Sequence, residues 1–223
     1  MKSALIQFWK DENPARSAAE NMALDEVLFL SAIRENIVRV RFYTWSMPAV
    51  TVGYFERPQT RRGVRRMTGG GTVEHGNDVT FSLAFPGTTA MARASGPDRY
   101  RHVHESLTLA LNSAVHSAQL LVSRKKSTGP CFASPVQWDI IDPASGSKIA
   151  GGAQRRSRGA VMHQGSVRVP DELRSPHARW VDPFLQALAE QARSFSDETI
   201  EELIQSSKIL VREKYETKEW NTL

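Results

Sequence analysis

Three consecutive glycines, Gly69 to Gly71, follow two arginines and precede a short polar segment and an alternating apolar run. Residues without a Cβ atom allow positive φ values and let another molecule approach the main chain closely. Exposed backbone N–H groups beside Arg65 and Arg66 suit a carboxylate, a phosphate or an acyl carbonyl. A glycine-rich hairpin with solvated arginines is the alternative. The polar segment 75–78 favours a binding site, because polar groups that gather at the mouth of a strand are typical of one.

The single cysteine, Cys131, is the second candidate for chemistry. One cysteine excludes an internal disulfide and a cysteine-based zinc cluster. The thiol is therefore either an inert buried group or a nucleophile, since a thiolate attacks acyl groups when its pKa is lowered. The histidines at 102, 104 and 116 have the wrong spacing for a paired ligand set, so we predict surface or capping roles for them and no metal site.

Length and composition indicate an ordinary enzyme-sized domain. The chain has 223 residues, 40% of them hydrophobic and 24% charged, and we expect one catalytic domain over residues 1–223. No apolar run reaches the roughly 18 residues of a membrane span. The N-terminus becomes charged before a signal-peptide core can develop, so we expect a cytoplasmic protein without a membrane partner.

The net charge of +5 points to an acidic partner. No nucleic-acid module accompanies the basic residues, and aromatic residues make up only 8% of the chain, so an acidic protein is favoured over nucleic acid. The basic residues cluster at Arg57, Arg61, Arg62, Arg65 and Arg66, then at Lys125 and Lys126, then at Arg155, Arg156 and Arg158.

The elements that must position these residues follow from periodicity. Helical spacing predicts an amphipathic helix over 18–33 and a second over 99–121, and alternation predicts strands within 38–54, over 79–85 (half-buried), 136–141, 148–153 and 161–169. Helices are also predicted from Pro183 and over 197–206, the latter capped by Ser196, followed by a short strand over 209–211. Strands and helices do not alternate strictly, so we predict an α+β fold with a mixed or antiparallel sheet packed against helices.

Four segments in order carry a family resemblance. They are ENMALDEVL (20–28), RFYTWSMPAVTVGYF (41–55), RRMTGGGTVEHGNDVTFS (65–82) and KIAGGAQRRSRGAVMHQGSV (148–167). Together they resemble the lipoate–protein ligase A / biotin–lipoate ligase catalytic domain family and cover most of the chain from residue 20 to 167. The resemblance implies a biotin/lipoate ligase-like catalytic domain.

The segment CFASPVQWDII, followed by KIAGGAQ, is similar to the branch of that family that moves octanoyl groups with a cysteine. Lys148 follows Cys131 by about the family's distance (148 − 131 = 17 positions). The resemblance implies that an octanoyl thioester passes from acyl carrier protein to Cys131, and then to a lysine on a lipoyl domain of a dehydrogenase subunit or on glycine-cleavage protein H. Cys131 and Lys148 would be the catalytic residues, and no cofactor would be needed.

The resemblance also implies a substrate-binding set. Lys148 and nearby backbone N–H groups would hold the acyl carbonyl and the tetrahedral oxyanion. An eight-carbon chain would lie among aromatic and apolar side chains, although an aromatic residue beside a strand is more often part of the core. The expected binding residues are Trp45, Tyr54, Arg65, Arg66, Gly69, Gly70, Gly71, Thr72, His75, Gly151, Ala153 and His163.

Two features depart from the family pattern. Family members usually have glutamine then histidine before the glycine of the last block, whereas here His163 precedes Gln164, which would turn the imidazole to the opposite face of the strand. Little sequence follows residue 190, so we expect no accessory domain. Two alternatives stay open: an ATP- and magnesium-dependent lipoate–protein ligase, and a non-catalytic homologue that binds acyl groups or lipoyl domains.

Overall fold

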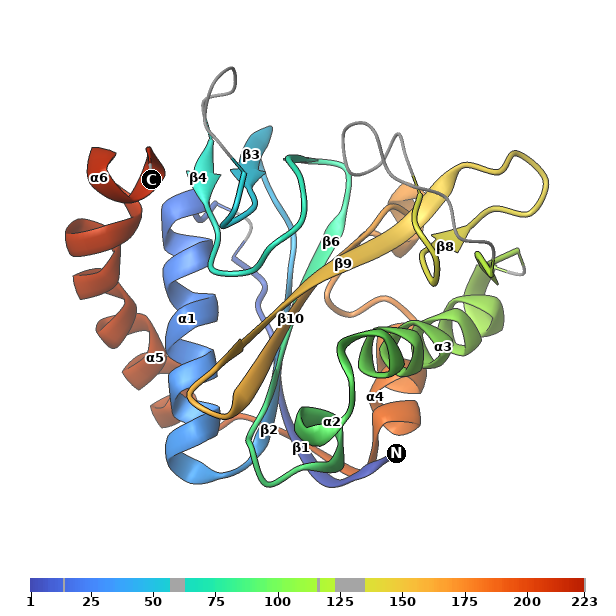
Figure 1. The fold of residues 1–223 in the computed structure, drawn as a ribbon, viewed down its shortest axis with the longest axis horizontal. Coiled ribbons are helices and arrows are strands. Elements are labelled where there is room, and N and C mark those ends of the chain that lie inside the picture. Colours follow the sequence, from blue (N-terminus) through green and yellow to red (C-terminus); the bar gives the residue numbers. More distant parts are fainter. Residues whose placement is uncertain (14, 57–62, 116, 123–134, 223) are drawn as a thin grey trace.

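The computed structural model describes residues 1–13, 15–56, 63–115, 117–122 and 135–222. Within these residues, an eight-stranded mixed sheet lies between two layers of helices, with a three-stranded sheet beside it (Figure 1). The strands are β1 Ser3–Lys10, β2 Val38–Tyr43, β3 Ala49–Val52, β4 Val64–Arg65, β5 Val73–His75, β6 Val79–Phe85, β7 Gln119–Leu120, β8 Ile140–Ile141, β9 Lys148–Ser157, β10 Ala160–Val167 and β11 Ala189–Ser194. The helices are α1 Ala18–Glu35, α2 Ala90–Arg93, α3 Gly96–Val115, α4 Val181–Leu188, α5 Asp197–Leu210 and α6 Lys218–Asn221, with a 3-10 turn at Asp171–Leu173 and a π turn at Val211–Tyr215.

The large sheet has the order β11-β1-β2-β6-β10-β9-β8-β7. Strand β1 runs parallel to both of its neighbours, and the other pairings in this sheet are antiparallel. The small sheet has the order β4-β3-β5 and contacts α1. The predicted α+β fold with a mixed sheet is confirmed.

Helix α1 forms because its ends are well capped. Ser17 accepts a hydrogen bond from the Glu20 N–H and Glu20 bonds back to the Ser17 N–H, a reciprocal capping box. Asn36 ends the helix with a φ of 55°, in the left-handed region that asparagine tolerates. The predicted helix over 18–33 is therefore confirmed, and it packs against α5 on one face of the sheet.

Strand β6 is buried on both faces, so the prediction of a half-buried strand is wrong. Its odd-numbered residues, such as Phe81, join the large core cluster with α3 and α4. On the other face Ala84 packs with Phe29 of α1. The alternation of apolar and polar residues arose because Thr80 and Ser82 face a buried polar region near α1, not solvent.

Three other element predictions need correction. The apolar run 209–211 is not a strand but the end of α5 and the start of the π turn, because the helix capped by Ser196 continues through it. The helix predicted over 99–121 starts at Gly96 and ends at Val115, before β7. Of the strand predicted over 136–141, only Ile140–Ile141 pairs, since Val136 and Asp139 close a turn.

No helix in the part of the chain that the structure describes combines the length and apolar character that crossing a membrane requires.

Candidate functional site

A narrow cavity lies between α1, the small sheet and strands β6, β9 and β10. Its volume, counted as the space that the centre of a water molecule can occupy, is about 40 Å³. Among the predicted binding residues, Arg66, His75, Gly151 and Ala153 line it. The complete lining is Met22, Thr51, Arg66, Val73, His75, Thr80, Gly151, Gly152, Ala153, Gln164, Gly165 and Ser166.

Arg66 fixes the glycine turn. Its guanidinium donates hydrogen bonds to the carbonyl oxygens of Gly69 and Gly71, both at 2.7 Å, and to the carbonyl and hydroxyl oxygens of Thr51. Four acceptors on three residues hold the turn against β3. Arg66 is buried, so the interpretation of solvated arginines is wrong for this position.

Arg65 is also fully buried and does not line the cavity. Its guanidinium donates to the carbonyl oxygens of Gly53, Tyr54, Glu56 and Trp220. These bonds tie the chain before the glycine turn to the C-terminal helix α6. Arg65 thus contributes to the site by holding the main chain in place.

The glycine turn lies against β9 at one end of the cavity. A Cβ atom on Gly53 would lie 1.7 Å from the Gly70 carbonyl oxygen, so the two main chains are in direct contact. Gly70 has a φ of +81°, and a Cβ on it would lie 3.3 Å from the Cβ of Ala153. Only glycine allows this packing at both positions.

The remaining predicted residues of the turn lie beside it. Gly69 is next to the Phe55 ring, Gly71 borders open space, and the Thr72 hydroxyl donates to Glu56 Oε1 at 2.9 Å. None of these three lines the cavity.

His75 is held on three sides, by Asp78, Thr51 and Trp45. Its Nδ1 lies 2.9 Å from Asp78 Oδ2, its Nε2 lies 2.9 Å from Thr51 Oγ1, and its ring stacks on Trp45 at 4.3 Å between centroids. A carboxylate only accepts hydrogen bonds, so the Nδ1–H group donates to Asp78. The site therefore contains an oriented imidazole whose Nε2 is directed at Thr51, a residue that lines the cavity.

Asp78 anchors this arrangement. Its Oδ2 also accepts hydrogen bonds from Thr80 at 2.9 Å and Ser166 at 2.5 Å. Burial alone would raise the pKa of Asp78, but the neighbouring His75 and the donated hydrogen bonds outweigh it and hold that pKa below its usual value. Asp78 consequently remains a carboxylate and keeps His75 oriented.

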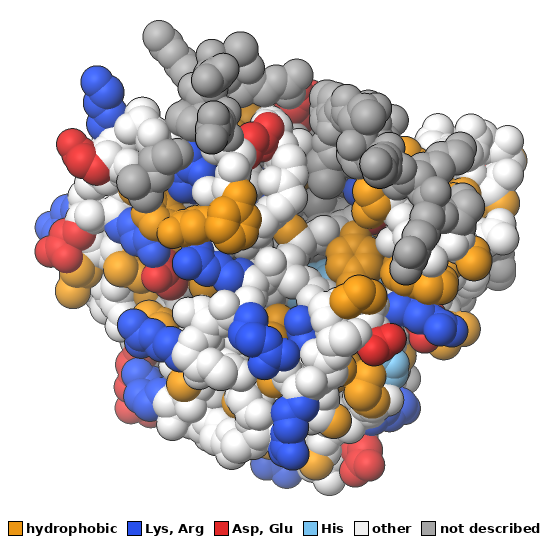
Figure 2. Space-filling view, viewed as in Figure 1, with side chains coloured by type: hydrophobic (Ala, Val, Ile, Leu, Met, Phe, Trp, Pro, Cys, Tyr) orange, Lys and Arg blue, Asp and Glu red, His pale blue; other side chains and the backbone are white. Residues whose placement is uncertain are grey.

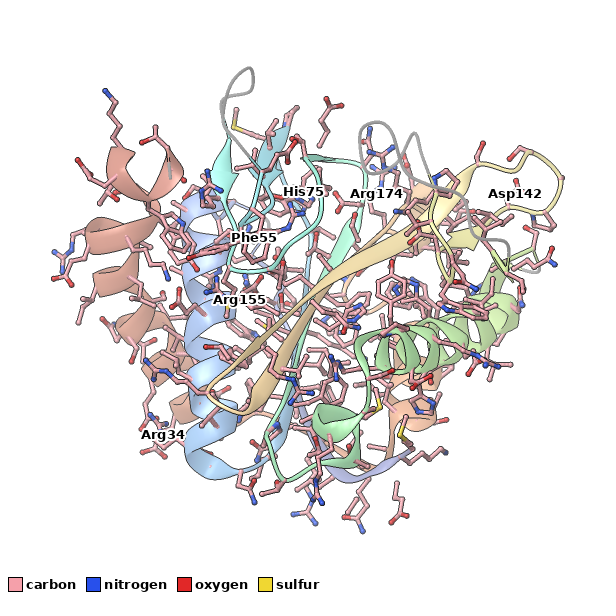
Figure 3. All side chains as sticks on the ribbon, in the orientation of Figure 1. Arg34, Phe55, His75, Asp142, Arg155 and Arg174 are labelled. Atoms are coloured by element: carbon pink, nitrogen blue, oxygen red, sulfur yellow. The ribbon has the colours of Figure 1, made fainter. Side chains whose placement is uncertain are left out.

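The two predicted aromatic residues lie outside the cavity lining. Trp45 is buried, and its indole N–H donates to Thr80 Oγ1 at 2.9 Å. Tyr54 lies under the Arg155 guanidinium, 3.9 Å from ring centroid to Cζ, and beside the exposed Phe55. Figure 3 shows Phe55 and Arg155 on the same side of the molecule, below His75.

Lys148, the first residue of β9, packs against the cavity-lining Gly151 but is not itself among the residues that line the cavity. Its side chain is 2% exposed, and its ammonium nitrogen lies 2.8 Å from Asp139 Oδ2. A Cβ atom on Gly151 would lie 2.2 Å from Lys148 Cε and 2.3 Å from Nζ. The ammonium therefore occupies the space that a side chain at Gly151 would fill, and Gly151 itself lines the cavity.

Two residues that the sequence did not single out complete this region. The Tyr100 hydroxyl donates to Asp139 Oδ1 at 2.5 Å and accepts from the Gly152 N–H at 3.0 Å. Asp139 Oδ2 also accepts from the Val136 N–H at 2.7 Å. The signal in the sequence was weak: Tyr100 precedes Val103 by three positions and so shares the buried face of the predicted helix.

His163 and Gln164 face opposite sides of β10. His163 is fully buried and stacks on Phe81 with centroids 5.7 Å apart, whereas Gln164 lines the cavity. Burial, with the positive charge of its neighbours, lowers the pKa of His163 well below its usual value. Gln164 accepts from Thr68 Oγ1 at 2.6 Å and donates to Asp25 Oδ2 at 2.7 Å, so its amide orientation is fixed.

His104 is buried as well, so its predicted surface or capping position is wrong. Its Nδ1 lies 2.6 Å from the Trp138 carbonyl oxygen, and its ring lies 4.0 Å from that of Tyr100. Burial is the main reason that the pKa of His104 falls to about 4. The predicted catalytic residue Cys131 and His116 lie outside the described residues.

A groove continues from the cavity along Gly152 and Ala153. Figure 2 shows hydrophobic side chains on either side of a hollow in this face of the molecule, with several Lys and Arg side chains around it. The groove is lined by Gly70, Gly96, Pro97, Tyr100, Val136, Gln137, Trp138, Gly152, Ala153 and Gln154. Among the described residues, no group of three or more His, Cys, Asp or Glu side chains is arranged to hold a metal ion.

Comparison with known proteins places this geometry in context. Residues 17–207 match the family described as lipoyl protein ligase A/B catalytic domain. Octanoyltransferase LipM of Kyrpidia tusciae is 30% identical over 86% of this chain and 80% of its own length. Octanoyltransferase LipM of Bacillus anthracis is 28% identical over 92% of this chain and 94% of its own length.

Solved structures share the fold. Protein Ta0514 of T. acidophilum with bound lipoic acid has a TM-score of 0.71 at 18% identity, with both chains fully covered. A lipoate-protein ligase A bound with ATP has a TM-score of 0.66 at 20% identity, covering 100% of this chain and 99% of the other. The biotin/lipoate ligase-like fold predicted from the sequence is confirmed.

Proposed function

We propose a function for this chain, which belongs to the lipoyl protein ligase A/B catalytic domain family. It transfers an octanoyl group from acyl carrier protein to a lysine of a lipoyl domain. The relatives named octanoyltransferase support this reaction. The structural observation that carries the proposal is the buried Lys148 ammonium packed against Gly151, which lines a narrow cavity. A fixed positive charge beside a slender cavity suits an acyl carbonyl at the head of an alkyl chain.

In the first half-reaction the Cys131 thiolate attacks the thioester carbonyl of the carrier-bound octanoyl group. The tetrahedral intermediate collapses, the bond to the carrier sulfur breaks, and the carrier leaves as a thiolate that takes up a proton. One thioester replaces another, so the step needs no ATP. This role of Cys131 is proposed from its place in the sequence, ahead of Lys148.

In the second half-reaction a lysine amine of the lipoyl domain attacks the Cys131 thioester. An amide bond forms, the Cys131 thiolate leaves, and the amine gives up a proton. His75 lines the cavity with Nε2 bonded to the Thr51 hydroxyl, so we assign it the relay of that proton through Thr51. An amide is more stable than a thioester, which makes this step favourable.

Both half-reactions pass through an oxyanion, and we assign its stabilisation to Lys148. Removing one such donor typically raises the barrier by about 2.7–4 kcal/mol. The alkyl chain would lie along Met22, Val73 and the bare main chain of Gly151 and Gly152. Each buried CH₂ group contributes about 0.8 kcal/mol to binding.

The charge of the surface supports acidic protein partners. The segment 148–167, which forms β9 and β10, contains four basic residues and no acidic one. Arg156 and Arg158, at the tip of this hairpin, are exposed. Carrier proteins and lipoyl domains with acidic surfaces would be steered toward this face, with exposed Phe55 adding an apolar contact.

Intact-mass measurement tests the reaction. Incubation with octanoyl-acyl carrier protein should add one octanoyl group to the wild type, and a lipoyl domain should then remove it, without ATP. Cys131→Ser should lose the adduct. An unmodified wild type, or an equal adduct on Cys131→Ser, contradicts the proposal. Lipoylation of the acceptor by Cys131→Ala with lipoate, ATP and magnesium would select the ligase alternative.

A further inference from the structure

We propose that Tyr100 and Asp139 are positioning residues for this acyl transfer. The Tyr100 hydroxyl orients the Asp139 carboxylate, and the carboxylate holds the Lys148 ammonium beside the cavity-lining Gly151. The inference rests on the proposed function, because it concerns the rate at which the same site works.

Three separate elements meet at the Asp139 carboxylate. Tyr100 comes from α3, Asp139 from the turn before β8, and Lys148 from the start of β9. Oδ1 accepts from Tyr100 at 2.5 Å, and Oδ2 lies 2.8 Å from the Lys148 ammonium nitrogen. Both oxygens are thus engaged, and the plane of the carboxylate is fixed.

The direction of the Tyr100 hydroxyl is fixed by Gly152. Strand β8 pairs with β9 only at Lys148 and Ala150, so Gly152 lies beyond the end of that pairing. The Gly152 N–H donates to the Tyr100 hydroxyl oxygen instead, at 3.0 Å. This oxygen accepts a hydrogen bond from the Gly152 N–H, and its own hydrogen points to Asp139, because a carboxylate only accepts hydrogen bonds.

A lysine needs such support more than other cations do. Its ammonium is a compact charge on a flexible four-carbon stem with about 2 kcal/mol of rotamer entropy. The ammonium is useful for catalysis only where the oxyanion forms, and a misplacement of about 1 Å can cost about 10²-fold in rate. Asp139 is fully buried, so its own orientation depends on the hydrogen bonds that it receives.

Asp139 also joins Lys148 to the turn that follows the Cys131 segment. The Val136 N–H donates to the same oxygen that contacts the ammonium. Loss of the carboxylate would therefore remove one bond to the ammonium and one to the start of this turn.

Among the described residues, Tyr100 and His104 from α3 lie near Lys148 and Asp139, with His163 from β10 beyond them. The pKa of His104 is about 4 and that of His163 lies well below its usual value. Both imidazoles are thus neutral at neutral pH and add no charge beside the ammonium.

Tyr100→Phe tests the inference with a matched control. The variant keeps the ring beside His104 and removes only the hydroxyl. Tyr215→Phe removes an equivalent bond, from the Tyr215 hydroxyl to Glu26 Oε2 at 2.6 Å, between the C-terminal π turn and α1. We expect Tyr100→Phe to lower kcat for octanoyl transfer about tenfold with KM for the carrier unchanged, as loss of one orienting hydrogen bond would do. Tyr215→Phe should leave both constants unchanged.

Asp139→Asn tests the same positioning by removing the carboxylate. We expect it to lower kcat for octanoyl transfer at least about tenfold with KM for the carrier unchanged, because the ammonium is then held less firmly. Asp142→Asn, in the exposed turn between β8 and β9, is the control and should leave both constants unchanged. Thermal unfolding of each variant establishes that it is folded.

Equal kcat values for Tyr100→Phe and Tyr215→Phe, or a loss that appears only in KM, would overturn the inference. If Asp139→Asn does not fold, the Tyr100→Phe comparison still decides the question. Absence of any octanoyl adduct on the wild type would instead refute the proposed function, so the two failures are distinct.

Discussion

Gly151→Ala is the substitution whose effect the structure predicts most clearly. The added Cβ would lie 2.3 Å from the Lys148 ammonium nitrogen, and ordinary contact begins near 3.4 Å, so the nitrogen must move by about 1.1 Å (3.4 − 2.3 = 1.1). Asp139 Oδ1, at 2.8 Å from the same Cβ, must shift as well. These atoms end flexible side chains, and Gly151 does not have a positive φ, so the fold accommodates the change.

The expected effect falls on the rate of transfer. A misplacement of about 1 Å costs about 10²-fold, and complete loss of an oxyanion donor costs about 10²–10³-fold. We therefore expect Gly151→Ala to lower the single-turnover rate of octanoyl transfer about 10²-fold, with little change in the melting temperature.

Gly71→Ala is the matched control. A Cβ on Gly71 would meet no atom of the described residues within 4 Å, and its φ is not positive. The same substitution there should leave the rate within about twofold of the wild type, because it displaces nothing. A Gly151→Ala enzyme as fast as the wild type, or an equal loss in both variants, would refute the placement of the ammonium.

Three further predictions follow from burial and charge. The pKa of buried His104 is about 4 in the folded protein and 6.5 in the unfolded chain, so the unfolded chain takes up a proton first as the pH falls. The free energy of unfolding, measured with urea, should therefore be unaffected by this group above pH 6.5 and should fall by about 3 kcal/mol as the pH falls toward 4. Gly53→Ala places a Cβ 1.7 Å from the Gly70 carbonyl oxygen, a clash between main chains that should cost about 1–3 kcal/mol and lower the melting temperature. Arg158→Glu should lower kcat/KM for octanoyl-acyl carrier protein about tenfold at low salt and less at high salt.

Each of these predictions has its own control. His104→Gln should flatten the acid limb of the stability profile, and an unchanged limb would contradict the burial argument. Gly71→Ala serves again for Gly53→Ala, which should be the less stable of the two. Arg193→Glu makes the same charge change at an exposed position of β11, the edge strand that β1, β2 and β6 separate from the hairpin, and an effect equal to that of Arg158→Glu would exclude specific docking at the hairpin.

The sequence predicted elements with strong local signals. The helix over 18–33 has apolar residues at helical spacing, and Ser196 gives the start of α5. Strands β1 and β11 were not predicted, because the main evidence for each is its pairing with the other, which the sequence does not show. The exposed, polar segment AEQARS of β11 has little strand character, and it pairs in parallel with residues far away in the chain.

The site residues also divide into those with a local sequence signal and those that depend on contacts between distant segments. The glycine turn, His75 and the lysine of the last block were visible as motifs, and the structure brings His75 and Gly151 to one cavity. The bonds of Arg65 and Arg66 to carbonyl groups were not predictable, because an arginine near glycines suits a ligand as well as a main chain. The contact between Tyr100 and Asp139 joins residues 39 positions apart and depends on how α3 packs against β9.

The single-turnover rate of octanoyl transfer by Lys148→Ala tests the central claim most directly. If the buried ammonium stabilises the oxyanion, the rate should fall by about 10²–10³-fold while octanoyl-acyl carrier protein still binds. A folded Lys148→Ala variant that transfers octanoyl groups at the wild-type rate would contradict the account.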